Sequence, residues 1–331
     1  MNAPERIVRA LGLCSGGLDS ILSALVLKEQ GIDVTWVTFD TPFFPPVKAK
    51  KAARAHGIPL IIREITTEYL EMLKDPPGGF GKNMNPCRDC HALMFRLAGR
   101  IMAAEGFDFL FSGEVAGQRP MSQTKNSLRY VEKRSGFDGH IVRPLSAKVL
   151  PETIPEKEGL VDRDRLLGLS GRSRKPQMAL VERFGVREYP APAGGCLLTD
   201  VGFSKRLRDL FDHSGDVCKA DLNLLKHGRQ FRLTPSVKLI IGRDRRDNEQ
   251  IAQCAGEGDY LRIRCSTYAG PIGLLPKDAD EKSIRQAAAI LVGYTKAPVG
   301  TEVEVTVARS EGESPVRIVG LEPAACKAFL L

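Results

Sequence analysis

Short apolar runs alternate with segments of helical periodicity along the first half of the chain. The apolar runs predict strands at residues 7–13, 34–39, 60–65 and 107–111. The periodic segments between them predict helices at residues 19–30, 47–56 and 90–105. Strands that alternate with helices form parallel sheets, because each crossover helix returns the chain to the same edge. We therefore expect an α/β fold, a doubly wound parallel sheet whose ligands bind beyond the carboxyl ends of its strands.

The pattern changes near residue 200. Short β-type runs at residues 237–241, 260–264 and 302–308 alternate with polar turns, which is typical of an α+β domain. We therefore predict two domains, a larger α/β domain at residues 1–200 and a second, smaller α+β domain at residues 201–331.

Length and composition support two folded domains. The chain has 331 residues, of which 43% are hydrophobic and 27% charged, and a domain takes about 150 residues. These values exclude a disordered chain and a small disulfide-bonded scaffold. The sequence has no apolar run near the roughly 18 residues that cross a bilayer. We expect a cytoplasmic protein without a membrane partner, in which the eight cysteines are reduced.

Positive charge exceeds negative charge and concentrates in one segment. The chain has 48 Lys and Arg against 40 Asp and Glu, a formal net charge of +8. Such a basic run, at residues 225–246, either forms a solvated surface or contacts phosphates, and we favour a nucleic-acid contact. One acid, Asp244, lies among its basic residues, which are Lys226, Arg229, Arg232, Lys238, Arg243, Arg245 and Arg246.

The residues between the first predicted strand and helix form a candidate phosphate-binding loop. Their sequence is Ser15-Gly16-Gly17-Leu18-Asp19-Ser20. Two glycines let backbone amides approach an anion, the helix start adds partial positive charge, and the serine hydroxyls donate hydrogen bonds. No Gly-Lys-Ser/Thr follows, so the loop is not the P-loop of kinases and GTPases. An ordinary tight turn is the alternative, which the density of Gly, Ser and Asp disfavours.

Three cysteines form a candidate metal or redox site. Cys87 and Cys90 make a C-x-x-C pair at the opening of a helix, and Cys196 follows in a Gly- and Pro-rich segment. The pair fits zinc, with His91 as the nearest further ligand, or redox and persulfide chemistry. Three thiolates also match three irons of a [4Fe–4S] cluster whose fourth iron stays open. We interpret the other five as small core residues: Cys14, Cys218, Cys254, Cys265 and Cys326.

Two motifs in the first domain resemble those of known enzymes. The Ser15–Ser20 sequence resembles the loop of the PP-loop ATP pyrophosphatases (adenine nucleotide alpha hydrolase-like), which cleave ATP to AMP and pyrophosphate while adenylating a carbonyl-type oxygen. The segment 111–124 is similar to the Gly-Glu…Gly-Gln…Ser-Gln-Thr segment of tRNA 4-thiouridine synthetases, and Arg143-Pro144-Leu145 is similar to the segment that follows it there. The resemblance covers roughly the first 150 to 200 residues.

This resemblance implies an ATP-dependent tRNA sulfurtransferase that makes 4-thiouridine or 2-thiouridine. It implies that residues Ser15 to Ser20 hold the pyrophosphate of ATP, and that Asp19 holds part of a Mg²⁺ site and is catalytic. Three further residues are expected at the nucleotide: Asp40, Gly113 and Gln118. Asp40 ends the second predicted strand, where a turn cap is the alternative role.

The cysteine spacing is similar to that of the cluster-dependent tRNA thiolation enzymes of the same superfamily. This resemblance implies that Cys87, Cys90 and Cys196 are catalytic and ligate a [4Fe–4S] cluster, with persulfide or disulfide chemistry and structural zinc as alternatives. The sulfur donor is expected to be sulfide or a persulfide from a cysteine desulfurase. Whether the protein forms a homodimer stays open.

The segment 221–233, together with residues 237–243 and Asn248-Glu249, resembles the RNA-binding domain found at the end of NFACT-type proteins. This domain takes the place of the tRNA-anchoring THUMP domain of 4-thiouridine synthetases. The resemblance implies tRNA as a partner, with Phe231 either stacking on a base or lying in the core. The expected phosphate contacts are Lys226, Arg229, Arg232, Arg243 and Arg245.

Two other functions fit part of the sequence. The first is a PP-loop enzyme that acts on a small-molecule acceptor, with the cysteines binding zinc. The second is a non-catalytic adaptor that senses ATP and binds RNA. The intact Ser15–Ser20 loop argues against the adaptor.

Overall fold

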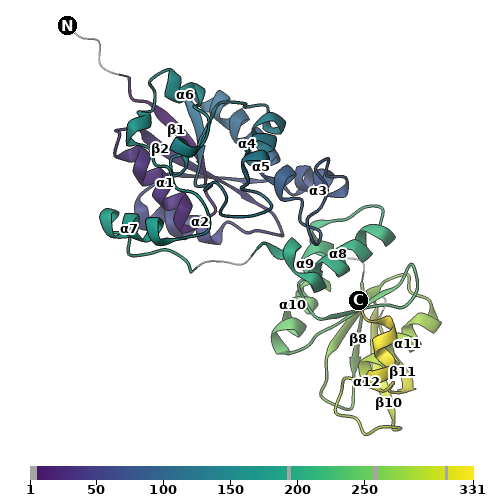
Figure 1. Ribbon diagram of the computed structural model, residues 1–331. Helices are drawn as coiled ribbons and strands as arrows, with labels where there is room; N and C mark the ends of the chain where they lie inside the picture. The colour runs from purple at the N-terminus through teal and green to yellow at the C-terminus, as the bar shows by residue number, and fades with distance from the viewer. Residues whose placement is uncertain (1–5, 192–194, 256–259, 310–311) are drawn as a thin grey trace. The chain divides into compact units, whose positions relative to one another are not determined.

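The computed structural model describes residues 6–191, 195–255, 260–309 and 312–331. The chain divides into two compact units, Met1–Leu197 and Leu198–Leu331 (Figure 1). The division falls close to the boundary that we placed at residue 200. None of the helices in the described ranges is long and apolar enough to cross a membrane.

The described part of the first unit is built on a five-stranded parallel sheet of order β3-β2-β1-β4-β5. The central pairing joins Leu13 of β1 to Ser112 of β4. Both neighbours of β1 run parallel to it, so the expected doubly wound α/β fold is confirmed. The strands are β1 (Arg9–Leu13), β2 (Asp33–Asp40), β3 (Leu60–Glu64), β4 (Phe109–Ser112) and β5 (Ile141–Val142).

Helices cover both faces of this sheet, with α1, α2 and α7 on one side and α4 and α5 on the other (Figure 1). The first face buries the apolar stripe of α1, including Ile21 and Leu22, against the sheet. The helices are α1 (Leu18–Lys28), α2 (Val47–His56), α3 (Thr66–Lys74), α4 (Cys87–Glu105), α5 (Lys125–Ser135), α6 (Ile154–Lys157) and α7 (Lys175–Phe184). Short 3₁₀ turns lie at Ala147–Val149, Arg163–Arg165 and Leu197–Thr199.

The strand order places one crevice in this unit. The chain leaves β1 toward β2 on one side and returns to β4 on the other, so the direction of winding reverses between β1 and β4. In an open α/β sheet, ligands bind outside the carboxyl ends of the strands at such a reversal. The loops after Leu13 and Ser112 meet at this point.

The described part of the second unit is built on a six-stranded antiparallel sheet of order β11-β10-β8-β9-β7-β6. This confirms the smaller α+β domain. Its strands are β6 (Arg229–Arg232), β7 (Lys238–Ile241), β8 (Tyr260–Cys265), β9 (Ile272–Pro276), β10 (Glu302–Arg309) and β11 (Gly312–Val319). Its helices are α8 (Val201–His213), α9 (Lys219–Leu224), α10 (Arg245–Ala255), α11 (Glu281–Val292) and α12 (Pro323–Cys326), and a 3₁₀ turn follows at Lys327–Phe329.

Alternation along β7 explains why this sheet has helices on both faces. Leu239 and Ile241 pack into the core beneath α11, whereas Ile240 packs with Ile251 of α10. Successive residues of a strand point to opposite faces, so one short apolar strand supports both layers.

Candidate active site

Two glycines allow close backbone packing at the crevice: Gly16 against the start of α2, and Gly113, after β4, against the start of α1. Gly16 has φ +73°, and a Cβ there would lie 2.3 Å from the carbonyl carbon of Lys48, so the loop packs directly on the start of α2. A Cβ on Gly113 would lie 2.4 Å from the carbonyl carbon and oxygen of Asp19. Only glycine fits at either position without moving the backbone. Residues 15–20 and Gly113 are therefore neighbours, as we expected from the motifs.

The loop amides have weak partners that an anion could replace. Gly16 N–H donates to Cys14 Sγ at 3.3 Å, Gly17 N–H to Ser15 Oγ at 3.3 Å, and Ser15 N–H to Ser20 Oγ at 3.4 Å. The two contacts to serine oxygens are long for hydrogen bonds, and sulfur is a weak acceptor. Among the described residues, no side chain caps the N-terminus of α1 at Gly17. A phosphate would therefore find donors and the positive end of the α1 dipole in one place.

Unpartnered oxygen atoms collect beside this loop. Gln118 Nε2 donates to Asp19 Oδ2 at 3.1 Å. Asp19 Oδ1 and Gln118 Oε1 are both buried and have no hydrogen-bond partner in the described parts of the chain. Buried acceptors without donors are costly, and a bound ion or an ordered water would satisfy them. Carboxylate and amide oxygens are the ligands that Mg²⁺ prefers, so these atoms fit such an ion.

Cys87, Cys90 and Cys196, here called the cysteine cluster, lie close enough to one another to interact electrostatically. Cys87 and Cys90 both lie in the first turn of α4, which begins three residues earlier than the helix predicted from residue 90. Pro86 at the N-cap explains the earlier start, because proline suits the beginning of a helix. The residues just before Gly195 and Cys196 lie outside the described parts of the chain.

Tyr69 of α3 contacts the cysteine cluster, a contact that the sequence pattern did not predict. It is fully buried, packs against Phe43 and Phe44, and donates a hydrogen bond to Cys90. Burial and the neighbouring thiols hold the pKa of Tyr69 well above its usual range. Tyr69 therefore stays protonated and available as a donor.

Burial also controls Cys90. All three cysteines keep some exposed surface, but burial around its sulfur raises the pKa of Cys90 to about 12, although the Tyr69 hydrogen bond opposes the shift. Cys196 and Cys87 disfavour a thiolate at Cys90 further. Cys90 is therefore a thiol at neutral pH, and a thiolate there requires a compensating cation.

The geometry of the cysteine cluster stops short of a formed metal site. Within the described ranges, no three His, Cys, Asp or Glu side chains converge closely enough to hold a metal ion. His91, the nearest further zinc ligand by sequence, instead places its Nδ1 2.8 Å from Glu114 Oε1. The expectation that the cysteine cluster binds a soft metal therefore rests on the type of ligand, three thiols, and not on their present arrangement.

The other cysteines follow our prediction only in part. Cys14 and Cys326 are buried core residues, as we expected. Cys265 is only partly buried, and the core prediction is wrong for Cys218, which is exposed. The side chain of Cys254 lies outside the described residues.

A buried ion-pair network joins the two parts of the crevice. Glu114, directly after Gly113, accepts hydrogen bonds from Arg143 Nε at 3.0 Å and from Ser112 Oγ at 3.1 Å. Arg143 also pairs with Glu132. Burial alone would raise the pKa of Glu114, but Arg143 and His91 lower it to about 2. Gly113-Glu114 and Arg143 come from the two motifs that we singled out.

Asp40 lies at the carboxyl end of β2, paired in register with Glu64, on the same edge of the sheet as the loop. The next residue, Thr41, is buried, and its Oγ1 accepts hydrogen bonds from the N–H groups of Phe43 and Phe44 at 3.2 Å and 3.3 Å. The turn after β2 is thus capped by Thr41.

The basic run of the second unit is largely committed to internal ion pairs. Arg232 makes a two-pronged contact with Asp209 at 2.9 Å and 2.7 Å, and Lys238 lies 3.2 Å from the same carboxylate. Burial lowers the pKa of Lys238 to about 8. Arg243 pairs with Asp247. These contacts leave less free positive charge than the sequence suggests.

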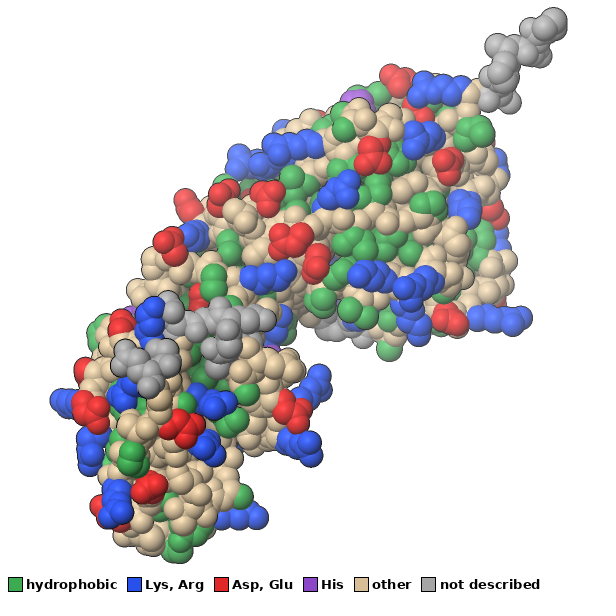
Figure 2. Space-filling model, turned by 180° about the vertical axis from the view of Figure 1, so that it is seen from behind, with side chains coloured by type: hydrophobic (Ala, Val, Ile, Leu, Met, Phe, Trp, Pro, Cys, Tyr) green, Lys and Arg blue, Asp and Glu red, His purple; other side chains and the backbone are tan. Residues whose placement is uncertain are grey.

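Other basic residues remain accessible. The side chain of Arg245 is 94% exposed and pairs with Glu249 along α10. Arg229 stacks over the ring of Tyr294 at 4.8 Å, and Lys226 donates to Asn223 at 2.8 Å. On the face seen in Figure 2, Lys and Arg side chains of both units are interspersed with acidic ones.

Phe231 is fully buried in the core of the second unit. Of the two roles weighed for it, the core position is correct and base stacking is excluded.

Family models of known proteins match part of each unit. A family model described as Thiamine biosynthesis protein (ThiI) matches residues 7–150, and one described as NFACT protein RNA binding domain matches residues 228–329. Both resemblances drawn from the sequence motifs are thereby confirmed. The first unit is therefore similar to the ThiI family and the second unit to the NFACT-type RNA-binding domain.

Curated proteins are similar to part of this chain. A probable tRNA sulfurtransferase of Ureaplasma parvum is 31% identical over 147 residues, which are 42% of this chain. A probable tRNA sulfurtransferase of Oceanobacillus iheyensis is 25% identical over 160 residues, which are 44% of this chain. Each match covers 37% of the relative, so the chain spans little more than a third of the length of these curated relatives.

Among solved structures, a 4-thiouridine synthetase in complex with RNA and bound ATP is 21% identical to this chain. The alignment covers 54% of this chain and 52% of that chain, with a TM-score of 0.34.

Proposed function

We propose that this chain, with its ThiI-type domain and its NFACT-type RNA-binding domain, is an ATP-dependent tRNA sulfurtransferase. The observation that carries the proposal is that the Ser15–Ser20 loop and the cysteine cluster both lie at the carboxyl ends of the strands of one sheet. ATP activation and sulfur transfer need such proximity, because the activated oxygen must be displaced where it is formed.

A continuous chain of contacts connects the two. Cys90 is followed by His91, whose Nδ1 lies 2.8 Å from Glu114. Glu114 follows Gly113, which packs against the backbone of Asp19. The first turn of α4 and the phosphate-binding loop are therefore separated by one short loop.

The loop residues support the ATP half of the reaction. The backbone amides and the Ser15 and Ser20 hydroxyls would bind the β,γ-pyrophosphate, and Asp19 with Gln118 would hold Mg²⁺ through their unpartnered oxygens. A bound Mg²⁺ ion supplies neutralisation of the phosphate charge. The carbonyl oxygen of a uridine then bonds to the α-phosphorus while the bond to pyrophosphate breaks, which leaves an adenylated base.

The cysteine cluster supports the sulfur half. A sulfur nucleophile adds to the activated carbon, and AMP leaves with the former carbonyl oxygen. We propose that Cys87, Cys90 and Cys196 ligate a [4Fe–4S] cluster, which supplies an open iron for the incoming sulfide. The raised pKa of Cys90 argues against a free thiolate nucleophile at this position, and a bound metal ion would supply the positive charge that a thiolate there requires.

The second unit would bind the tRNA. Residues 228–329 of this unit match the family model of the NFACT protein RNA binding domain. Of the basic residues expected to contact phosphates, Arg245 is the most exposed, whereas Arg232 is held by Asp209. We therefore propose Lys226, Arg229, Arg243 and Arg245 as the phosphate contacts, with Arg232 supporting the fold.

AMP release by the full-length protein tests the proposal. Purified, reconstituted protein is mixed with ATP, Mg²⁺, sulfide and unmodified tRNA, and both AMP and thiolated nucleosides are measured. We expect tRNA-dependent AMP release that Asp19→Ala abolishes, because the loop loses its carboxylate ligand. Asp164→Ala, which removes an exposed carboxylate of the same unit, serves as the control. AMP release without any requirement for tRNA would contradict the proposal and favour a small-molecule acceptor.

A further inference from the structure

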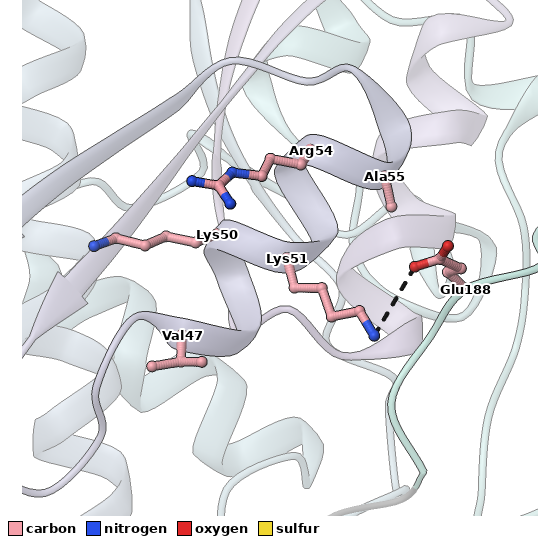
Figure 3. Close-up of a pocket in the computed structure, with 6 residues that line it drawn as sticks. All are labelled: Val47, Lys50, Lys51, Arg54, Ala55 and Glu188. Carbon is pink, nitrogen blue, oxygen red and sulfur yellow. Dashed lines mark ion pairs between the residues drawn. The ribbon is translucent and has the colours of Figure 1, made fainter.

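Helix α2 presents a basic surface beside the phosphate-binding loop. No Asp or Glu occurs between Asp40 and Glu64 in the sequence. Three exposed residues of the helix, Lys50, Lys51 and Arg54, line a hollow of ≈ 510 Å³ (Figure 3). We call these three residues the α2 basic face.

The charge of this face is poorly neutralised. Lys51 Nζ lies 3.9 Å from Glu188 Oε2, and both side chains remain more than half exposed. Within the described residues, no acid forms an ion pair with Lys50 or Arg54. Their side chains extend to the same side of the helix, away from Glu188 (Figure 3). Two positive charges are therefore available to one ligand.

Arg54 lies in the last turn of α2, where positive charge is favourable, but the three residues repel one another along the helix. The first turn of α2 has no acidic residue to complement the positive end of the helix dipole. Lys50 and Arg54 are four positions apart, and Lys51 and Arg54 three, so like charges face each other along the helix. Like charges held together without an acid between them are expected where the residues serve an anionic ligand.

We propose that the α2 basic face binds the phosphate backbone of the tRNA substrate, an inference that rests on the proposed function. The hollow is open and also lined by Val47 and Ala55, which suits a strand crossing a surface. The start of α2 packs against Gly16 of the phosphate-binding loop. RNA held on α2 would therefore lie next to the bound ATP, and the catalytic unit would position the acceptor base independently of the second unit.

The test combines tRNA binding with AMP release in the full-length protein. The variant Lys50→Ala/Lys51→Ala/Arg54→Ala removes three positive charges. The matched control Lys28→Ala/Lys133→Ala/Lys157→Ala removes three exposed lysines from α1, α5 and α6, so the net charge is the same. Trp36 fluorescence checks that both variants are folded.

We expect the α2 variant to bind tRNA at least tenfold more weakly than the control. The slope of log binding constant against log salt concentration, the salt slope, should become shallower by about one for each lost phosphate contact. Its KM for ATP should stay unchanged, and its thermal stability should equal or exceed that of wild type because repulsion is relieved. Equal tRNA affinity in the two variants, or a raised KM for ATP alone, would overturn the inference. Wild-type protein that neither binds tRNA nor releases AMP would instead refute the proposed function.

Discussion

The buried carboxylate of Glu114 offers a quantitative test of how the crevice is held together. Its side chain is 6% exposed and accepts hydrogen bonds from Arg143 and Ser112. Its pKa is about 2 in the folded protein against an ordinary value of 4.5. At 1.36 kcal/mol per pKa unit, this difference corresponds to about 3 kcal/mol of stability.

The sign follows from the direction of the shift. Because folding lowers the pKa of Glu114, its contribution is complete above pH 4.5 and is lost as the pH falls toward 2. Glu114→Gln should therefore destabilise the first unit by about 3 kcal/mol at pH 7, and the gap to wild type should shrink to less than half by about pH 3.

Urea unfolding of the full-length protein, followed by Trp36 fluorescence between pH 3 and pH 7, measures this gap. Trp36 is the one tryptophan of the chain and is fully buried in β2, so its emission reports on the first unit alone. Glu152→Gln, which neutralises an exposed carboxylate of the same unit, is the control and should change stability little. A Glu114→Gln gap that is constant with pH, or absent at pH 7, would refute the reasoning about the network.

Three further predictions concern function. Replacing any one member of the cysteine cluster with Ala should remove the brown colour and the roughly four irons expected of anaerobically purified protein, and stoichiometric zinc in its place would contradict the iron cluster. Tyr69→Phe should leave the fold intact but lower the rate of sulfur incorporation several-fold without changing AMP release, because Cys90 loses its hydrogen-bond donor; an unchanged ratio of thiolation to AMP would exclude that role. Arg245→Ala should weaken tRNA binding and lower its salt slope by about one while sparing turnover at saturating tRNA, and an unchanged slope would remove Arg245 from the interface.

Much of the fold followed from local pattern. The helix expected at residues 47–56 has those bounds in the structure, and the strands expected at 34–39 and 60–65 match β2 and β3 to within a residue at each end. These segments carry strong periodicity between clear Gly and Pro boundaries, and local pattern is most informative there. The strand order then places the Ser15–Ser20 loop at the reversal point of the sheet.

What the sequence missed depends on contacts between distant residues. Nothing local distinguishes Tyr69 as the donor to Cys90, or Asp209 as the partner of Arg232 and Lys238. A count of charges in the sequence treats every basic residue as unpaired. In the folded chain, Asp209 of α8 pairs with both Arg232 and Lys238. The pairing of Glu114 with Arg143 likewise joins two motifs that the sequence presents separately.

The most direct test of the proposed function is mass spectrometry of the tRNA nucleosides from a strain that lacks this protein. The proposed function predicts the loss of 4-thiouridine or 2-thiouridine at a defined position, restored by the wild-type chain but not by Asp19→Ala. A full set of thiolated uridines in the deletion strain would contradict the assignment of this chain as a tRNA sulfurtransferase.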